Sequence, residues 1–434
     1  MNTSANLRWY QGVSRYQWLV LAIASLGWVF DAFEGQLFNV TRNQMLAEIL
    51  GQPAGSPDIR YWGDVLLAVF LLGGTIGGIF FAWLGDRIGR KPVLALTILF
   101  YSIFSGLTYF ATELWHVASL RFLVAMGVGG EWAVAAALVA EVMPKHARAH
   151  MSGIFHSTSI LGATLAAWVG IWVGTDWRLA FLIGVLPALL VLWVRMRLKE
   201  PESWEAARNA AAEDAEVQLG SFRELLTDRR WRVRAWGGMF LAAVGLATFW
   251  GVAVAGQDIA REFLLRDGVD PLEAAERAKF AFGNIEALGA GIGMFAFGAF
   301  AVRLGRKGTF ALYHIGALFI VAAICYLPTS YTMLLIMLPV FGFFTWGLHA
   351  GYAIYFPELF PDHLRATGTG FCFNGGRLLA SSMLVFSGWL KGLEGMNLEN
   401  AIVIMSSIFA LGLVVLWFMP ETKGKNLPGV RDEV

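Results

Sequence analysis

Long runs of apolar residues, separated by short polar segments, set the pattern of this sequence from end to end. Each run is close to the ~20 apolar residues that a transmembrane helix needs to cross a bilayer. The pattern therefore predicts an all-α polytopic membrane protein with twelve transmembrane helices. The predicted spans cover residues 17–40, 61–84, 92–112, 114–141, 151–174, 178–197, 232–256, 281–301, 309–328, 331–356, 369–391 and 399–419.

The longest polar break leaves six predicted spans on either side. It predicts an N-terminal six-helix bundle at 1–197, a cytoplasmic linker with short helices at 198–230, and a C-terminal six-helix bundle at 231–434. Lys and Arg gather in the segments that share a side with the two chain ends, and cytoplasmic loops carry such an excess. We therefore expect a multi-pass protein of the cell (inner) membrane with both termini cytoplasmic.

Composition removes several functional classes. Of 434 residues, 57% are hydrophobic and 15% are charged, whereas ordinary soluble domains are about 45–50% apolar. Lys and Arg number 33 against 32 Asp and Glu, so no charge excess indicates a nucleic acid partner. The chain shows neither metal-ligand spacing nor a nucleophile beside a base. We therefore expect no enzyme, no cofactor and no metal.

Two loop segments recur in the same order half a chain apart. EVMPKHARAHMSG at 141–153 is matched by ELFPDHLRATGTG at 358–370, an offset of 217 (358 − 141). GDRIGRK at 85–91 is matched by VRLGRK at 302–307, with the shared arginines 216 residues apart (303 − 87). Two matches at nearly one offset indicate two parallel, pseudo-symmetric halves. Transporters of this plan hold their substrate at the midplane between the halves.

The loop motifs resemble those of the major facilitator superfamily: LGDRIGRKPV after the second span, RFLVAMGVGG in the fourth, EVMPKHARAHMSG after it, and PETKG after the twelfth. The resemblance implies alternating access, with a cytoplasmic gate that holds the inner helix ends together. Val302 stands where the second copy would repeat Asp86, so we expect an uneven gate. Alternatively, the basic loops only orient the spans. The implied gate residues are Asp86, Arg90, Glu141, Arg303, Arg306, Glu358 and Arg365.

Ionisable side chains inside the predicted spans indicate function, because each costs at least ~2.5–3.5 kcal/mol to insert. Asp31 and Glu34 in the first span lie about 60° apart on a helix, and two carboxylates that close in a low dielectric do not readily both ionise. We expect this pair to accept a proton, Arg121 to neutralise one of its members, and Glu131 to be a second proton site. The alternatives are a purely structural pairing with Arg121 and, for Glu131, a structural hydrogen bond to the fifth span.

Arg377 lies in the eleventh span, which contains no acidic residue. A substrate carboxylate would satisfy its guanidinium bidentately, so we expect Arg377 to bind the substrate. Asn374 lies one turn away on the same face. The alternative is a structural salt bridge to Glu286 in the eighth span. Aromatic residues that could line a central cavity are Phe33, Trp250, Tyr352 and Tyr355.

Two branches of the superfamily are compatible with the motifs. PESWE and PETKG resemble the sugar porters, but the seventh span lacks the glutamine pair of that pattern. DAFEGQ, GVGGEWAVAAALVAEVMPK and RATGTGFCFNGGRLLA resemble the proton-coupled organic-anion symporters of the sialate, lactate and aromatic-acid types. The resemblance therefore implies proton-coupled symport of a small organic anion (a monocarboxylate, an aromatic acid or a sialate-like molecule) by a monomer in the lipid bilayer. The alternatives are a proton-coupled sugar or polyol porter, a non-transporting sensor and a channel.

Overall fold

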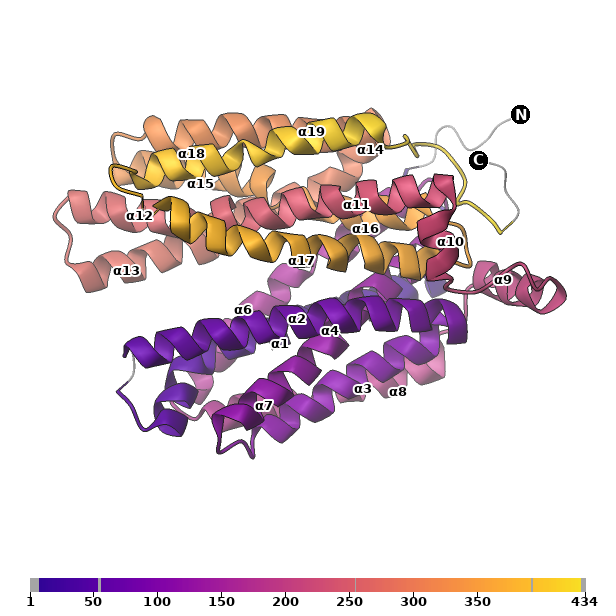
Figure 1. Cartoon of the computed structure of the whole chain (residues 1–434), viewed down its shortest axis with the longest axis horizontal. Coiled ribbons are helices and arrows are strands. Elements are labelled where there is room, and N and C mark those ends of the chain that lie inside the picture. The colour runs from indigo at the N-terminus through magenta and orange to yellow at the C-terminus, as the bar shows by residue number, and fades with distance from the viewer. Residues whose placement is uncertain (1–7, 54–55, 254, 392, 431–434) are drawn as a thin grey trace.

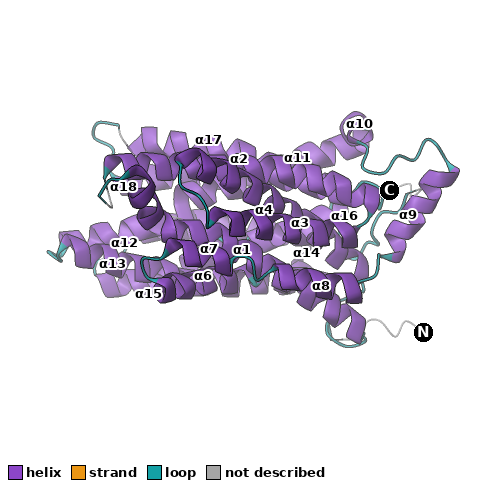
Figure 2. Ribbon diagram, turned by 90° about the horizontal axis from the view of Figure 1, so that it is seen from below, coloured by secondary structure: helices purple, strands orange, loops and turns teal. Residues whose placement is uncertain are grey.

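The computed structural model describes residues 8–53, 56–253, 255–391 and 393–430. Within these ranges every regular element is helical, and the long helices run along one common direction in two bundles (Figure 1, Figure 2). Residues 85–91, 141–148, 302–307 and 358–365 lie together at one end of the bundles, which we call the motif end. The opposite end is called the open end.

The first half contains the six predicted N-terminal spans. Its first helix is longer than the predicted 17–40, because a capping box of Ser14 with Gln17 starts it and Gly51, with φ of 62°, ends it. The fifth and sixth spans are each divided into two helices. The elements are α1 (Arg15–Leu50), α2 (Pro57–Ile88), α3 (Arg90–Thr108), α4 (Leu114–Val142), α5 (Arg148–Ser157), α6 (Ser159–Val173), α7 (Trp177–Ile183) and α8 (Ala188–Arg197).

The second half contains the other six spans. Two π-helical turns, Phe249–Ala253 and Ala281–Glu286, interrupt the seventh and eighth spans, and both spans continue beyond their predicted ends. The eighth and ninth spans form one element that is broken at Gly305, with φ of 82° and ψ of 172°. The α-helices are α11 (Arg229–Thr248), α12 (Ala255–Arg266), α13 (Pro271–Phe280), α14 (Ala287–Tyr326), α15 (Tyr331–Thr345), α16 (His349–Leu359), α17 (Arg365–Lys391), α18 (Leu398–Ser406) and α19 (Ile408–Phe418).

Two short helices, α9 (Glu202–Glu213) and α10 (Phe222–Thr227), connect the halves at the motif end. The buried indole of Trp204 donates to the carbonyl of Asp86 in the first half at 2.7 Å. Glu224 accepts from His363 of the second half at 2.9 Å. The connection is therefore docked against both halves rather than extended between them.

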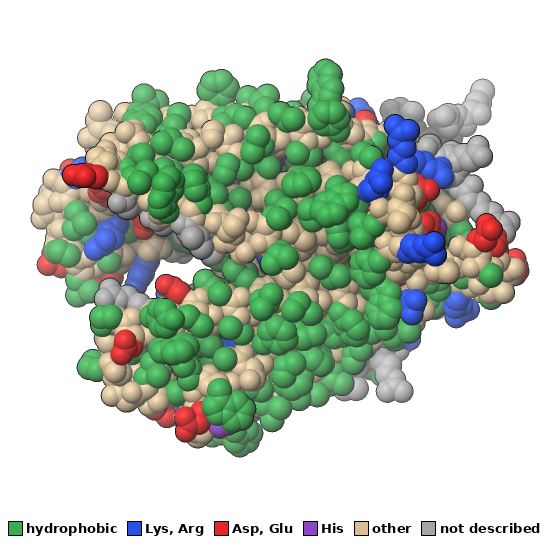
Figure 3. Space-filling model, in the orientation of Figure 1, with side chains coloured by type: hydrophobic (Ala, Val, Ile, Leu, Met, Phe, Trp, Pro, Cys, Tyr) green, Lys and Arg blue, Asp and Glu red, His purple; other side chains and the backbone are tan. Residues whose placement is uncertain are grey.

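The surface is apolar along the flanks and charged at the ends, and the halves are separated by a hollow at the open end (Figure 3). Large apolar side chains are strongly exposed, such as Ile171 (82%), Trp417 (82%) and Phe319 (74%). Nine helices of the described ranges are long and apolar enough to cross a membrane. Such a belt matches the hydrocarbon core of a bilayer. The count is nine because Pro271–Tyr326 contains two spans, the sixth span is made of short helices and α17 is not counted; helices occupy all twelve predicted spans in two bundles, which confirms the predicted architecture.

Candidate functional site

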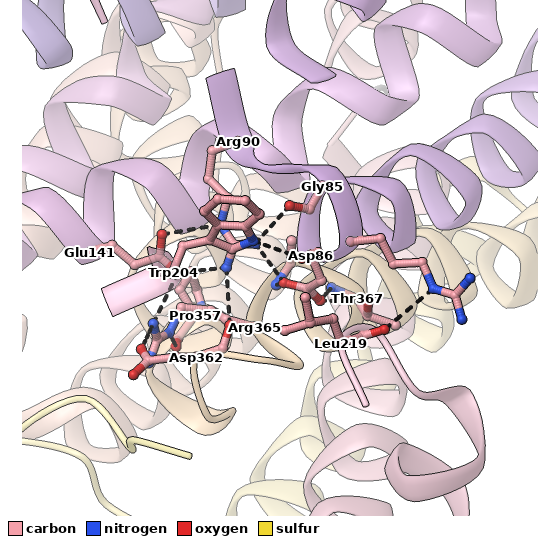
Figure 4. A network of polar contacts seen from close by, with 12 residues as sticks. Gly85, Asp86, Arg90, Glu141, Trp204, Leu219, Pro357, Asp362, Arg365 and Thr367 are labelled. Atoms are coloured by element: carbon pink, nitrogen blue, oxygen red, sulfur yellow. Dashed lines mark hydrogen bonds and ion pairs between the residues drawn. The ribbon is translucent and has the colours of Figure 1, made fainter. Parts of the chain in front are cut away.

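A network of buried charges joins the two halves at the motif end (Figure 4). Arg90, the first residue of α3, is fully buried and pairs with Asp86 (Nη1–Oδ1, 2.8 Å) and with Glu141 (Nη2–Oε1, 2.7 Å). Its Nε donates to the other oxygen of Glu141 at 3.1 Å. Bidentate ion pairs of this kind are strong and fix the orientation of both partners. Arg90 thus ties together the ends of α2, α3 and α4.

Asp86 also reaches the second half, where it caps α17. Its carboxylate accepts from the backbone N–H groups of Ala366 (3.1 Å) and Thr367 (2.8 Å) and from the Thr367 hydroxyl (2.6 Å). Because α17 begins at Arg365, these N–H groups belong to its first turn, where free donors and the helix dipole favour negative charge. A carboxylate of one half therefore stabilises a helix end of the other.

Glu141 forms a second link across the interface. While it holds Arg90, it accepts from Arg365 Nη1 at 3.0 Å, and Arg365 also pairs with Asp362. Arg365 Nη2 donates to the carbonyl of Pro428 at 2.9 Å. In the loop before α17, burial raises the pKa of the Asp362 carboxyl against the opposing effect of the Arg365 charge. Each charged side chain of this network has a partner, so the contact between the halves at the motif end is closed and fully paired.

The second copy of the motif forms a comparable network inside its own half. Arg306 binds Glu358 through Nε (2.8 Å) and Nη2 (2.6 Å). The Thr422 hydroxyl donates to the same carboxylate at 2.5 Å. All three residues belong to the second half, so these bonds do not join the halves.

The two copies differ at the position of Asp86. Val302, its counterpart, is 39% exposed and offers no acceptor. The Arg303 side chain is exposed, and only its backbone carbonyl takes part, as acceptor for Lys423. The role of Arg303 in the gate therefore stays a prediction, since its exposed side chain takes no part in the hydrogen-bonded network of the described residues. In the described chain, the first copy joins the halves through the hydrogen bonds of Asp86 to the start of α17 and the ion pair of Glu141 with Arg365.

Two glutamates that the sequence analysis did not assign complete both networks. Glu200 accepts from the first two backbone N–H groups of α3 at 2.9 and 3.1 Å. Glu421 does the same for the two N–H groups after the break in α14, at 2.9 and 3.0 Å. Gly89 and Gly305 precede these N–H groups with positive φ, and a Cβ at either would lie within 2.6 Å of a glutamate oxygen. In the sequence, each of these glutamates stands beside a proline shortly after the last span of its half, as Glu200–Pro201 and Pro420–Glu421. This repeated pair could have indicated them.

Deeper in the first half, Glu34 and Arg121 form a loose buried pair. Their closest atoms, Nη1 and Oε1, are 3.8 Å apart, and neither side chain is more than 1% exposed. The guanidinium lies over the rings of Phe38 (4.7 Å) and Phe70 (4.3 Å). Within the described residues, neither Glu34 oxygen has a hydrogen-bond partner. The predicted partner of Glu34 is thus present, but the pair is incompletely satisfied.

Asp31 does not have Glu34 as its main neighbour, contrary to the prediction. It interacts most strongly with Glu131 of α4, and the positive charge that acts on it comes from Arg377 of α17, in the other half. Asp31 and Glu131 are each 1% exposed. The reason lies at Gly27, one turn earlier in α1, where a Cβ would lie 1.9 Å from Glu131 Oε1. This glycine admits the Glu131 side chain against α1, beside Asp31.

Arg377 and Asn374 project from α17 onto glycines of α2. A Cβ at Gly74 would lie 2.8 Å from Arg377 Nη1, and one at Gly78 would lie 2.2 Å from the Asn374 amide. Asn374 is fully buried, and its Oδ1 has no partner in the described part of the chain. Two of the predicted substrate-binding residues, Arg377 and Asn374, therefore reach across from the second half to the first.

The predicted alternative for Arg377, a salt bridge to Glu286, is not formed among the described residues. Glu286 is fully buried in the second half. A Cβ at Gly256 would lie 2.2 Å from its Oε2, and one at Gly342 would lie 3.0 Å from its Cγ. Glu286 thus occupies a slot between α12 and α15. Asp31 is the carboxylate whose charge acts on Arg377.

The four predicted cavity-lining aromatic residues do not gather at one place. The Tyr352 hydroxyl donates to a carbonyl of α11 at 3.0 Å, and the Tyr355 hydroxyl donates to a carbonyl beyond α19. Phe33 is 2% exposed in the core of the first half. Trp250 packs edge-to-face on its neighbour in a π-helical turn. In this structure Phe33, Tyr352 and Tyr355 are packed or hydrogen-bonded within their own halves, and their place in a substrate cavity stays a prediction.

A different aromatic cluster crosses the interface. Trp132 of α4 stacks on Phe373 of α17 with ring centroids 4.0 Å apart, and the Arg377 guanidinium lies 5.2 Å from the same Phe373 ring. Trp132 Nε1 donates to His156 Nδ1 at 3.1 Å, and Trp28 stacks on His156 at 5.4 Å. The sequence could have indicated this cluster, because its aromatic residues lie close to the predicted site residues. Trp132 directly follows Glu131 in GGEW, and Phe373 precedes Arg377 by one helical turn in FCFNGGR.

Comparisons with known proteins bear on this arrangement. Residues 24–378 match the family described as Major Facilitator Superfamily, and residues 328–433 match Sugar (and other) transporter. The sialic acid transporter NanX of Escherichia coli K12 is 27% identical, over 95% of this chain and 96% of that protein. The niacin transporter NiaP of Acinetobacter baylyi is 26% identical, over 96% and 97%. The solved structure of the proton:xylose symporter XylE bound to 6-bromo-6-deoxy-D-glucose has the same fold, with TM-score 0.74, 19% identity and coverage of 96% and 99%.

Proposed function

The chain belongs to the major facilitator superfamily, and from that premise we propose that this membrane transporter carries a small organic anion together with a proton. One observation carries the proposal. Glu131 packs against α1 at Gly27, one turn before Asp31, and Arg377 of the second half packs onto Gly74 of α2, so that its charge acts on Asp31. These positions support a proton acceptor in the first half that faces an anion-binding group of the second half across their interface.

The chemistry of the three groups explains the coupling. Two adjacent carboxylates away from water do not both remain charged, so the Asp31–Glu131 pair retains a proton readily. When the pair is singly charged, Arg377 has a counter-ion. When the pair takes up a second proton, Arg377 is left without one, and a substrate carboxylate supplies it through a bidentate contact. Proton and anion therefore bind together, and neither the empty nor the loaded site holds an uncompensated charge.

The motif end supplies the gate in this proposal. The Asp86–Arg90–Glu141–Arg365 network closes that end, while Figure 3 shows the hollow at the open end. With the motif end in the cytoplasm, as the Lys and Arg distribution indicates, the structure corresponds to a site reached from outside. Opening to the cytoplasm then requires the contacts of Asp86 and Glu141 with the second half to break.

The relatives support an anion as cargo. Sialic acid and niacin, named for two of them, both carry a carboxylate. A neutral sugar is the alternative, favoured by the match of residues 328–433 to the sugar transporter family. Arg377 weighs against it, because a neutral cargo leaves this half-buried cation without a counter-ion when Asp31 is protonated.

The test is uptake by the purified protein in liposomes that contain a pH-sensitive dye. Niacin, sialic acid and xylose are added outside, with and without an inward proton gradient. We expect a carboxylate to accumulate and to acidify the lumen, with Arg377→Gln inactive and Arg266→Gln, which alters an exposed ion pair of α12, unaffected. Accumulation of xylose but of no carboxylate would replace the proposal with a sugar porter. Carboxylate uptake without any proton movement would remove the coupling.

A further inference from the structure

A groove runs along the outside of the second half between the start of α11 and the end of α19. Its first part has a volume of about 370 Å³ and is lined by Arg229, Arg230 and Arg234 together with residues 418–420. Its second part, of about 330 Å³, lies beside Trp236. Both parts share Val233, Phe418 and Met419, so they form one continuous groove. We call it the α11–α19 groove.

The charged part of the groove has free donors. Arg229, which lines the first part, and Arg232, which lines the second, are exposed, and neither side chain has an ion-pair or hydrogen-bond partner among the described residues. Arg230 lies 3.8 Å from Asp228, in a half-exposed pair. The Arg234 guanidinium already has a hydrogen-bond partner, because its Nη1 donates to a carbonyl of α16 at 2.9 Å. The side chains of Arg229 and Arg232 are therefore free to bind an anion, and the side chain of Arg230 forms only a weak ion pair with Asp228.

The rest of the groove is apolar and uncovered. The exposed fractions of Val233, Trp236, Phe240 and Phe418 are 47%, 43%, 48% and 71%. Trp236 and Phe240 lie seven and eleven residues beyond Arg229. At 1.5 Å per residue they are about 10 and 16 Å farther along α11. The groove thus passes from a cationic mouth at the motif end to an apolar channel on the membrane-facing flank.

We propose that the α11–α19 groove binds one anionic phospholipid, with its phosphate at the arginines and an acyl chain along Trp236 and Phe240. The charge of the mouth requires an anion. The exposed apolar channel that continues from it requires a hydrocarbon chain, which free phosphate lacks. Basic clusters beside a transmembrane helix are typical sites for acidic lipid headgroups. Tryptophan near the headgroup level is likewise typical of membrane interfaces.

The groove is connected to the motif end. Met419 and Pro420 line it, and the next residue, Glu421, caps the helix that begins after Gly305. The Tyr355 hydroxyl also donates to the Pro420 carbonyl. A lipid in the groove therefore lies against the segment that completes the second-half network. This site is independent of the cargo and of the proposed function.

The experiment is lipid titration of the purified, delipidated full-length protein, followed by native mass spectrometry. Phosphatidylglycerol and phosphatidylcholine with the same acyl chains are compared, and glycerol phosphate and inorganic phosphate serve as competitors. The triple variant Arg229→Gln/Arg230→Gln/Arg232→Gln removes three positive charges from the mouth of the groove. Arg208→Gln/Arg223→Gln/Lys425→Gln removes three exposed charges elsewhere at the motif end and is the matched control.

We expect one phosphatidylglycerol to bind with a preference over phosphatidylcholine of roughly 30-fold, because each of two free basic residues contributes about five-fold. The triple groove variant should lose this preference, and the control variant should keep it. Trp236→Ala should weaken binding of long-chain phosphatidylglycerol while the three arginines remain. Equal binding of both lipids, equal loss in the control variant, or displacement of the lipid by inorganic phosphate would overturn the proposal. Retained helicity by circular dichroism shows that each variant is folded.

Discussion

Replacement of Thr367 by valine tests whether the halves are held together at the motif end by the contacts of Asp86. The Thr367 hydroxyl donates to the Asp86 carboxylate at 2.6 Å, across the interface, and the residue is 1% exposed. Valine keeps the size and the backbone N–H but removes this one bond. A hydrogen bond to a charged group contributes about 1.5–3 kcal/mol. The equilibrium should therefore shift by roughly 10- to 150-fold away from the closed motif end.

Thr422→Val is a matched control from the second half. Its hydroxyl donates to the Glu358 carboxylate at 2.5 Å, which is the same chemistry with both partners in one half. The variant loses a bond of the same kind, but nothing between the halves. We expect Thr422→Val to lower the thermal stability and to leave the balance between the conformations unchanged.

The assay is a distance measurement between spin labels on Ile88 and Val302, which are exposed at the motif ends of α2 and α14 (47% and 39%). The two native cysteines, Cys325 and Cys372, are first replaced by alanine. Thr367→Val should add a population with a longer distance, whereas Thr422→Val should reproduce the parent distribution. The reasoning is refuted if Thr367→Val leaves the distribution unchanged, or if both variants shift it equally.

Three further predictions concern the centre of the interface. Asp31→Asn should abolish accumulation driven by a proton gradient while substrate exchange continues, because Glu131 alone no longer forms a proton-holding pair; counterflow and uptake in liposomes measure both. Arg377→Lys should weaken carboxylate binding at least about tenfold by calorimetry, since a point charge replaces a bidentate donor; unchanged affinity would contradict this role. Gly74→Ala should displace the Arg377 guanidinium, which lies 2.8 Å from the position of the new Cβ. Carboxylate binding should weaken, while the stability of the protein should not change. Gly73→Ala should instead lower stability by about 1–3 kcal/mol, because its Cβ would lie 2.3 Å from a backbone carbonyl of α4.

The architecture was predictable because a bilayer makes strong demands on sequence. Apolar length defines each span, and the repeated loop motifs define the two halves. The points at which spans divide or bend were not predictable from the apolar content of the sequence. The fifth span divides at Thr158, the twelfth at Ser407, and α14 bends at Gly305. Hydropathy is insensitive to such points, because a broken and an unbroken helix expose the same side chains to lipid.

The candidate site was predictable in its residue types but not in its partnerships. Intramembrane charge indicated Asp31, Glu34, Glu131 and Arg377; Arg377 reaches the first half from α17, whereas Glu34 lies inside the first half beside Arg121. Helical spacing paired Asp31 with Glu34, whereas in the structure Glu131 occupies the place beside Asp31. Spacing within one helix cannot reveal which neighbouring helix comes close. That depends on a missing side chain at Gly27, which carries no charge or polarity to indicate it.

Polar atoms are hydrogen-bonded at the motif end of the interface and unsatisfied at its centre. This difference bears on how the closed motif end can open. At the motif end, Arg90, Glu141 and Arg365 have partners, which favours the closed contact. At the centre, the oxygens of Asp31 and the Oδ1 of Asn374 have none among the described residues. Buried groups in that condition cost free energy until a proton, an anion or water reaches them. In the proposed mechanism, a proton and an anion that bind the centre more tightly when the motif end is open would offset the loss of the motif-end contacts, and binding at the centre would then favour opening at that end.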